Sequence, residues 1–189
     1  QSPVLKIIKD QNDDIWFIVD NILGKASYPD YRLKETALPY YVTTLAEDIS
    51  REQIWIVGTK GLLSADINNG EIKEHKIEIK AKYVRSIAID AKKRIWLGSW
   101  GDGLYISDPE VSRFSYVNTN PDGSKNKNIN NSIILDIEID NNEIVWLGTA
   151  HGGVLKLYPN KGFVNISNTS YQDVFDQNVL AIYKGYDNQ

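Results

Sequence analysis

Four side chains with distinct chemistry occur at loop positions of this sequence, namely Trp100, His151, Lys60 and Asp102. An indole offers a flat apolar face and one N–H donor, and this combination suits the C–H faces and hydroxyls of a sugar. An imidazole can donate to a hydroxyl, and it changes charge near neutral pH. Each residue also has a plainer interpretation, because Trp100 could pack against a neighbouring part of the fold or a second domain, and a lone polar side chain at a loop tip is usually solvated.

The sequence lacks the residues that most catalytic and metal sites require. It has no cysteine, which excludes disulfides, thiol nucleophiles and Cys-based metal sites. Its two histidines, His75 and His151, fall in an outer strand and in a loop, so we expect no metal and no cofactor. No nucleophile-elbow, P-loop, dinucleotide-binding or H-E-x-x-H motif is present. Because these motifs are missing, we expect no catalysis from this segment. The net charge of −4 argues against nucleic-acid binding.

One pattern occurs four times along the chain. Its anchor is a tryptophan that follows an aliphatic residue, at Trp16, Trp55, Trp96 and Trp146. An aspartate precedes each tryptophan by six or seven positions, at Asp10, Asp48, Asp90 and Asp140. An active site needs one such residue and not four equivalents. We therefore interpret both sets as structural, the tryptophans filling the space between neighbouring units and the aspartates bonding turn amides.

The segments around each tryptophan predict short strands. They are rich in β-branched and aromatic residues, Gly, Asn and Asp separate them, and none holds a helical period. Four strands in about 40 residues make one propeller blade. The expected fold is all-β, a partial β-propeller of four blades of about four antiparallel strands plus the first strand of a fifth. We expect one domain over 1–189, with blades at about 1–39, 40–81, 82–131 and 132–176, and the fifth starting at 177–189.

The candidate ligand-binding residues should lie on one rim of such a propeller. The loop between the second and third strands of a blade shares a face with the connection to the next blade, and repeat folds concentrate function on such loops. Tyr41 and Tyr83 precede first strands, where they could stack on a ligand or fill the blade entrance. Arg85 and Asp136 lie in first strands, where an unpaired charge is costly to bury. We call the following the rim residues: Lys60, Trp100, Asp102, His151, Tyr41, Tyr83, Arg85 and Asp136.

The repeat resembles a known family, the two-component regulator propeller repeat. The clearest copies are S-I-A-I-D, R-I-W-L-G-S and G-L-Y at 86–90, 94–99 and 103–105, and D-I-E-I-D, I-V-W-L-G-T and G-G-V at 136–140, 144–149 and 152–154. This resemblance implies paired propellers in the periplasmic sensor region of Bacteroidetes hybrid two-component histidine kinases. It further implies an oligosaccharide signal and partners in the remaining blades and the downstream sensor domains. In that family the kinase core, the phospho-accepting His and the receiver Asp belong to other parts of the protein.

Two alternative functions fit the same repeat. The propeller could be a scaffold for protein–protein interaction or self-association, including a homodimer, because open blade edges can pair with another chain. It could also belong to a secreted polysaccharide-active enzyme, because a glycoside hydrolase needs only two carboxylates. No pair of acids stands out from the repeat.

Overall fold

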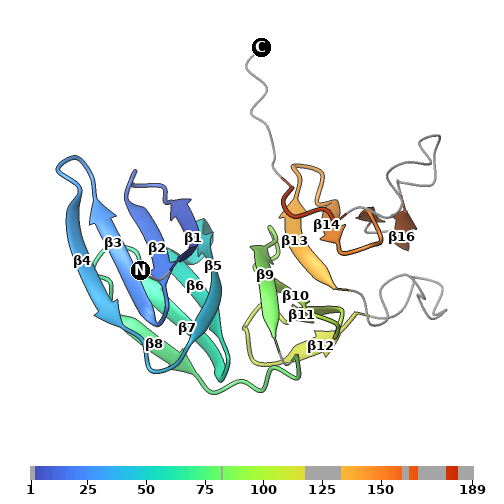
Figure 1. Cartoon of the computed structure of the whole chain (residues 1–189), viewed down its shortest axis with the longest axis horizontal. Coiled ribbons are helices and arrows are strands. Elements are labelled where there is room, and N and C mark those ends of the chain that lie inside the picture. The colour runs from blue at the N-terminus through green and yellow to red at the C-terminus, as the bar shows by residue number, and fades with distance from the viewer. Residues whose placement is uncertain (1–2, 82, 118–132, 159–161, 166–177, 183–189) are drawn as a thin grey trace, which may run out of the picture. The chain divides into compact units, whose positions relative to one another are not determined.

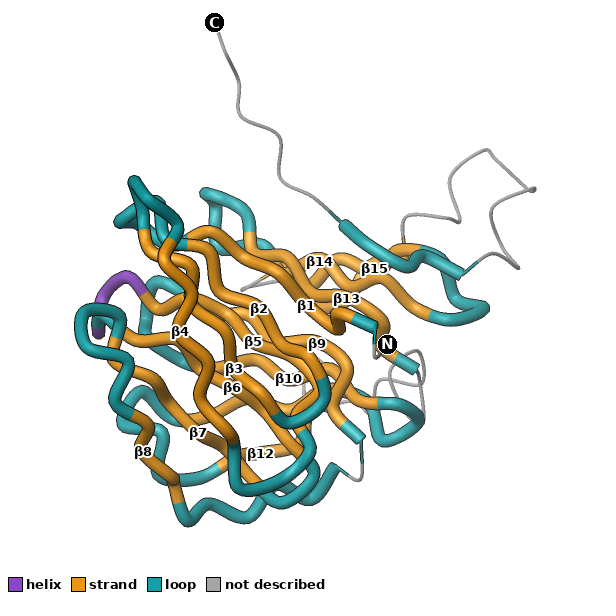
Figure 2. The backbone as a smooth tube through the Cα atoms, turned by 60° about the vertical axis from the view of Figure 1, so that its left-hand side comes forward, coloured by secondary structure: helices purple, strands orange, loops and turns teal. Residues whose placement is uncertain are grey.

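The computed structural model describes residues 3–81, 83–117, 133–158, 162–165 and 178–182. Within these ranges every regular element is a β-strand except one turn of 3-10 helix, η1 (Ile49–Arg51), which is purple in Figure 2. The strands form four sheets of four strands each, and consecutive strands pair antiparallel in each sheet (Figure 1). The prediction of an all-β fold built from blades of four antiparallel strands is confirmed.

The chain divides into two compact units, Gln1–Val84 and Arg85–Gln189, and each unit contains two sheets. The first sheet of the first unit is formed by β1 (Val4–Lys9), β2 (Ile15–Val19), β3 (Ile22–Ser27) and β4 (Arg32–Ala37). Its second sheet is formed by β5 (Val42–Asp48), β6 (Gln53–Gly58), β7 (Gly61–Asp66) and β8 (Ile72–His75).

The second unit repeats this arrangement. Its first sheet is formed by β9 (Val84–Ile89), β10 (Ile95–Ser99), β11 (Leu104–Ser107) and β12 (Phe114–Tyr116). Its second sheet is formed by β13 (Ile134–Ile139), β14 (Val145–Thr149), β15 (Val154–Tyr158) and β16 (Gly162–Asn165). The tryptophan of the repeat always lies on the second strand of its sheet.

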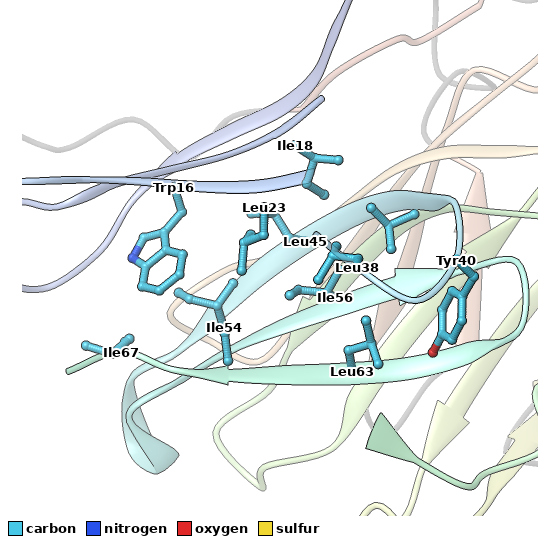
Figure 3. Packing of buried hydrophobic residues seen from close by; sticks show 12 residues of the cluster. Trp16, Ile18, Leu23, Leu38, Tyr40, Leu45, Ile54, Ile56, Leu63 and Ile67 are labelled. Carbon is cyan, nitrogen blue, oxygen red and sulfur yellow. The ribbon is translucent and has the colours of Figure 1, made fainter. Parts of the chain in front are cut away.

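The core of each unit lies between its two sheets. In the first unit Trp16 is 1% exposed and belongs to one buried cluster with Ile54 of β6 and with Ile67, which directly follows β7. Figure 3 shows its ring lying toward these two residues. In the second unit Trp96 belongs to a cluster with residues of β13 and β14, including Ile137 and Val145. A buried aromatic ring contributes a large apolar area, so these tryptophans supply much of the packing between adjacent sheets.

Three of the four first strands have a register shift at the same point. It falls between Val4 and Lys6 in β1, between Val42 and Thr44 in β5, and between Ile134 and Asp136 in β13. A bulge of this kind leaves one residue unpaired and changes the direction of its neighbours. Arg85 occupies the equivalent position in the sequence of β9.

The segment predicted to begin a fifth blade is described at residues 178–182, where no strand is assigned. The backbone N–H of Val179 donates to the carbonyl of Thr149 at 3.1 Å. The N–H of Ile182 donates to Asp136 Oδ2 at 2.7 Å. These two bonds hold the segment against β13 and the end of β14.

Candidate functional site

Each aspartate of the repeat is bonded to the tryptophan of its own sheet. The indole Nε1 donates to the carboxylate Oδ2 in all four sheets. The distances are 2.6 Å for Trp16–Asp10, 3.1 Å for Trp55–Asp48, 3.0 Å for Trp96–Asp90 and 2.9 Å for Trp146–Asp140. A buried indole N–H needs a partner, and this one is supplied from the turn between the first and second strands.

The second oxygen of each aspartate accepts backbone N–H groups of that turn. Asp140 Oδ1, for example, accepts from Asn142 at 2.8 Å and from Ile144 at 3.1 Å. Burial alone would raise the pKa of Asp140, but the bonds from Trp146, Ile144 and Asn142 hold it below its ordinary value. The pKa of Asp48 is lowered in the same way, since the bonds from Ser50, Arg51 and Trp55 outweigh its burial. These carboxylates are therefore ionised and committed to the turn.

A cation lies over the ring of every repeat tryptophan. The distances to the ring centroid are 4.9 Å for Lys25 over Trp16, 5.9 Å for Arg51 over Trp55, 5.6 Å for Arg94 over Trp96 and 3.7 Å for Lys156 over Trp146. The lysines lie directly opposite their tryptophan on the third strand. The arginines lie in or beside the first turn. Two different positions in the sequence thus supply the same cation–π contact.

A carboxylate accompanies each of these four cations. Lys25 forms an ion pair with Asp14 at 2.8 Å, and Arg94 pairs with Asp90 at 2.6 Å. Arg51 pairs with Asp48, and the charge of Lys156 lowers the pKa of Asp140. Every sheet therefore contains an indole, a cation and an anion in mutual contact or close proximity.

The loop that carries Trp100 has a fixed base. Ser99 donates to the carbonyl of Gly103 through both its backbone N–H, at 3.0 Å, and its hydroxyl, at 2.8 Å. Thr149 makes the same two bonds to Gly153, at 3.0 and 2.9 Å. Two loops of identical base thus carry different tips, Trp-Gly-Asp in one sheet and Ala-His-Gly in the next.

Trp100 itself is 52% exposed, although its backbone forms a bridge with Ile133. Arg85 of β9 is exposed, and its guanidinium carbon lies 5.7 Å from the centroid of the indole. These two rim residues are brought together by the structure. The sequence placed them in one blade but did not indicate that they touch.

The other rim residues of the second unit differ in their surroundings. His151 is exposed and has a φ of 64°, a left-handed conformation that glycine adopts at the equivalent Gly101 (φ 93°). Asp102 is half-buried; together with burial, its charge raises the pKa of Tyr105. The carboxylate of Asp136 accepts the N–H of Ile182, so it holds the segment 178–182 against β13.

The first unit holds the remaining rim residues. The carbonyl of Tyr41 accepts the backbone N–H of Thr59 at 2.9 Å and its hydroxyl at 3.3 Å, which joins the start of β5 to the loop that carries Lys60. Lys60 is exposed, and the rings of Tyr41 and Tyr83 are 41% and 38% exposed. The neighbouring Tyr40 is buried, and burial together with the charge of Glu74 raises its pKa to about 12.

The described residues contain neither a metal-binding cluster nor a helix that could span a membrane. No group of three or more His, Asp or Glu side chains in the described ranges is arranged to hold a metal ion. Among the same residues, no helix has the length and apolar character needed to cross a membrane.

Several solved structures share this architecture. The extracellular domain of BT4673 from B. thetaiotaomicron, named as a hybrid two component system, matches 80% of this chain with a TM-score of 0.63 and 23% identity. That of BT3049 from the same organism, named in the same way, matches 83% with a TM-score of 0.63 and 23% identity. The WD40 domain of Neurospora crassa Pan2 matches 87%, covering 50% of that chain, with a TM-score of 0.62 and 12% identity. The fold is that of a β-propeller.

The chain spans 21% of the length of each of the two extracellular domains. At these identities the likeness is one of fold. No family model matches the chain, and no curated protein matches it in sequence.

Proposed function

We propose that this chain is the ligand-sensing propeller segment of a periplasmic sensor of a two-component system, and that its signal is an oligosaccharide. The observation that carries the proposal is the exposed indole of Trp100 on a loop with a fixed base. The likeness to two extracellular domains that are named as hybrid two component systems supports the sensor role. In this proposal the segment binds the ligand and catalyses no reaction. The rest of the protein transmits the signal.

The arrangement of the loops supports binding without chemistry. The repeat carboxylates are committed to turn amides and indoles, which leaves Trp100, His151 and Asp102 as the variable tips of the second unit. An aromatic ring held by a rigid loop can stack on a sugar with little loss of conformational entropy. In the two sheets of the second unit the same loop positions differ in residue type while their base stays constant, as expected where specificity resides in the tips.

Binding of a panel of oligosaccharides to the intact protein tests this proposal. We expect at least one glycan to bind by isothermal titration calorimetry and Trp100→Ala to weaken it about tenfold or more. Tyr28→Ala, which removes an exposed aromatic ring from a turn of the first sheet, is the matched control and should leave the affinity unchanged. Full affinity in Trp100→Ala, with unchanged thermal stability, would remove Trp100 from the site.

A second function, protein–protein interaction, is favoured by a different surface. Tyr28, Tyr31 and Leu33 are all more than half exposed at the turn from β3 to β4, and the two tyrosine rings meet edge to face at 6.0 Å. Exposed apolar groups of this kind often mark a contact with another protein. Sedimentation of the intact protein at several concentrations tests self-association through this surface. A monomer at every concentration, with the same sedimentation behaviour in Leu33→Ser, argues against it.

A further inference from the structure

Five cation–π contacts to tryptophan occur in the described residues, and one differs from the rest. In four of them the tryptophan belongs to the repeat. The cation forms an ion pair with a carboxylate in three of these, and in the fourth the charge of Lys156 acts on Asp140. In the fifth, Arg85 lies over Trp100. Here the indole is half exposed, and no carboxylate of the described residues forms an ion pair with the guanidinium.

The surroundings of Arg85 keep its donors available to a ligand. It occupies the position in β9 that corresponds to the unpaired bulge residue of β5 and β13, and its side chain is exposed. Asp136, an acid in the first strand of the next sheet, accepts the N–H of Ile182. A guanidinium has five N–H donors in a planar fork. A cation–π contact with an indole does not occupy these donors, so they can still donate to a ligand.

We infer that the Arg85–Trp100 pair recognises an acidic sugar unit. The guanidinium would donate two parallel hydrogen bonds to a carboxylate or sulfate of the ligand, while the pyranose ring stacks on the exposed part of the indole. The ligand's anion would then complete the set of indole, cation and carboxylate that the fold builds in each of its four sheets. This inference rests on the proposed function and narrows its ligand class from any oligosaccharide to an anionic one.

The alternative explanations of the pair make different demands. A purely structural pair would resemble Arg94 and Trp96, in which the indole is buried and the cation is paired with Asp90, but Trp100 is 52% exposed against 5% for Trp96. A nucleic-acid surface would need several clustered cations, and the chain carries a net charge of −4. An acidic sugar supplies one anion for Arg85 and one ring face for the exposed indole of Trp100, so it fits the groups that are present.

The test compares acidic and neutral probes on the intact protein. The probes are trigalacturonate for the carboxylate, an unsaturated chondroitin sulfate disaccharide for the sulfate, and galactotriose as the neutral match. We expect an acidic probe to bind more tightly than galactotriose. Arg85→Gln should lower that affinity about tenfold to hundredfold, and Arg85→Lys, which keeps the charge but loses the fork, should lower it by less. Arg32→Gln, an equal loss of charge on the outer strand β4, should have no effect.

The outcomes separate this inference from the proposed function. Tighter binding of trigalacturonate identifies the carboxylate as the recognised group, and tighter binding of the chondroitin disaccharide identifies the sulfate. If only neutral glycans bind, or if Arg85→Gln binds an acidic probe as well as the unaltered protein does, the inference is wrong while the sensor proposal stands. If no glycan binds, the sensor proposal fails, and this inference fails with it.

Discussion

Asp90 and Trp96 are joined by a hydrogen bond of 3.0 Å from the indole Nε1 to the carboxylate Oδ2, and both side chains are buried. The same carboxylate oxygen pairs with Arg94, whose guanidinium lies 5.6 Å from the indole centroid. One aspartate thus fixes the first turn, the tryptophan of the second strand and the cation above it. Equivalent bonds in the other sheets make this set of contacts the repeating unit of the fold.

Removal of the carboxylate is expected to destabilise the sheet. Asp90→Ala leaves the indole N–H, the backbone N–H of Arg94 and the Arg94 guanidinium without their acceptor, and we expect the free energy of unfolding to fall by about 1–3 kcal/mol. Urea denaturation of the intact protein measures this change. Asp30→Ala, which removes an exposed ion pair with Arg32, should cost less than about 0.5 kcal/mol. Equal losses in the two variants would contradict this account.

The two sources of the cation should be interchangeable. Arg94→Ala removes both the cation above Trp96 and the ion pair with Asp90, and we expect a loss of about 1–3 kcal/mol. Ile106 lies opposite Trp96 on the third strand, where Lys25 and Lys156 lie opposite their own tryptophans. The double variant Arg94→Ala/Ile106→Lys should therefore recover part of the lost stability. Ile106 also packs against the buried cluster, so Ile106→Lys is measured in the unaltered protein as well. If Ile106→Lys costs as much stability in the Arg94→Ala protein as in the unaltered one, a lysine on the third strand does not replace the arginine of the turn.

His75 is expected to make the stability depend on pH. Its Nε2 lies 2.9 Å from the hydroxyl of buried Ser64, and its ring lies 4.8 Å from that of Trp55. Burial, aided by the charge of Lys73, lowers its pKa below the ordinary 6.5. The unfolded chain therefore takes up a proton more readily than the folded one, so this contribution to stability is complete above about pH 7.5 and declines as the pH falls through about 6.5.

Denaturation curves between pH 8 and pH 5 measure this dependence. His75→Gln should flatten the curve of stability against pH in that range. His151→Gln, at the other histidine of the chain, is the matched control for the loss of one imidazole. A slope that persists in His75→Gln would assign the dependence to other groups.

Gly98 is expected to tolerate no side chain. A Cβ at this position would lie 2.4 Å from the hydroxyl of Ser86 and 2.6 Å from Cγ2 of Ile134. Gly98→Ala should therefore force β9, β10 and β13 apart and cost about 1–3 kcal/mol. Gly101→Ala, where a Cβ meets nothing within 4 Å but φ is 93°, should cost about 1 kcal/mol. Thermal unfolding of the two variants ranks them, and the reverse order would contradict the packing described here.

Much of the fold could be predicted from the sequence because the same residue types recur at the same spacing in each repeat. The aliphatic–Trp pair, the preceding aspartate and the following glycine define strands and turns wherever they occur. The partner of the indole N–H could not be predicted, since spacing places an aspartate in a turn but does not say where its second oxygen points. The cations were missed for a related reason, because Lys156 and Arg94 occupy different positions in the sequence and converge only in space.

The candidate site was less predictable than the fold. Arg85 and Asp136 have similar places in first strands, and nothing in the pattern of residues distinguishes their roles. In the structure Asp136 accepts a backbone N–H from residue 182, whereas Arg85 lies over Trp100. Such differences depend on side-chain rotamers and on segments far away in the sequence, and neither follows from alternation of polar and apolar residues.

The Ser/Thr-to-Gly bonds at the base of two of the second-to-third strand loops allow the tip of each loop to vary while its base is kept. The bonds from Ser99 to Gly103 and from Thr149 to Gly153 close the loop using residues that flank its tip. The three residues between them can change in shape and charge without altering the strands. A library that varies only those three positions in these two sheets would therefore change the shape and charge of the surface at little cost in stability.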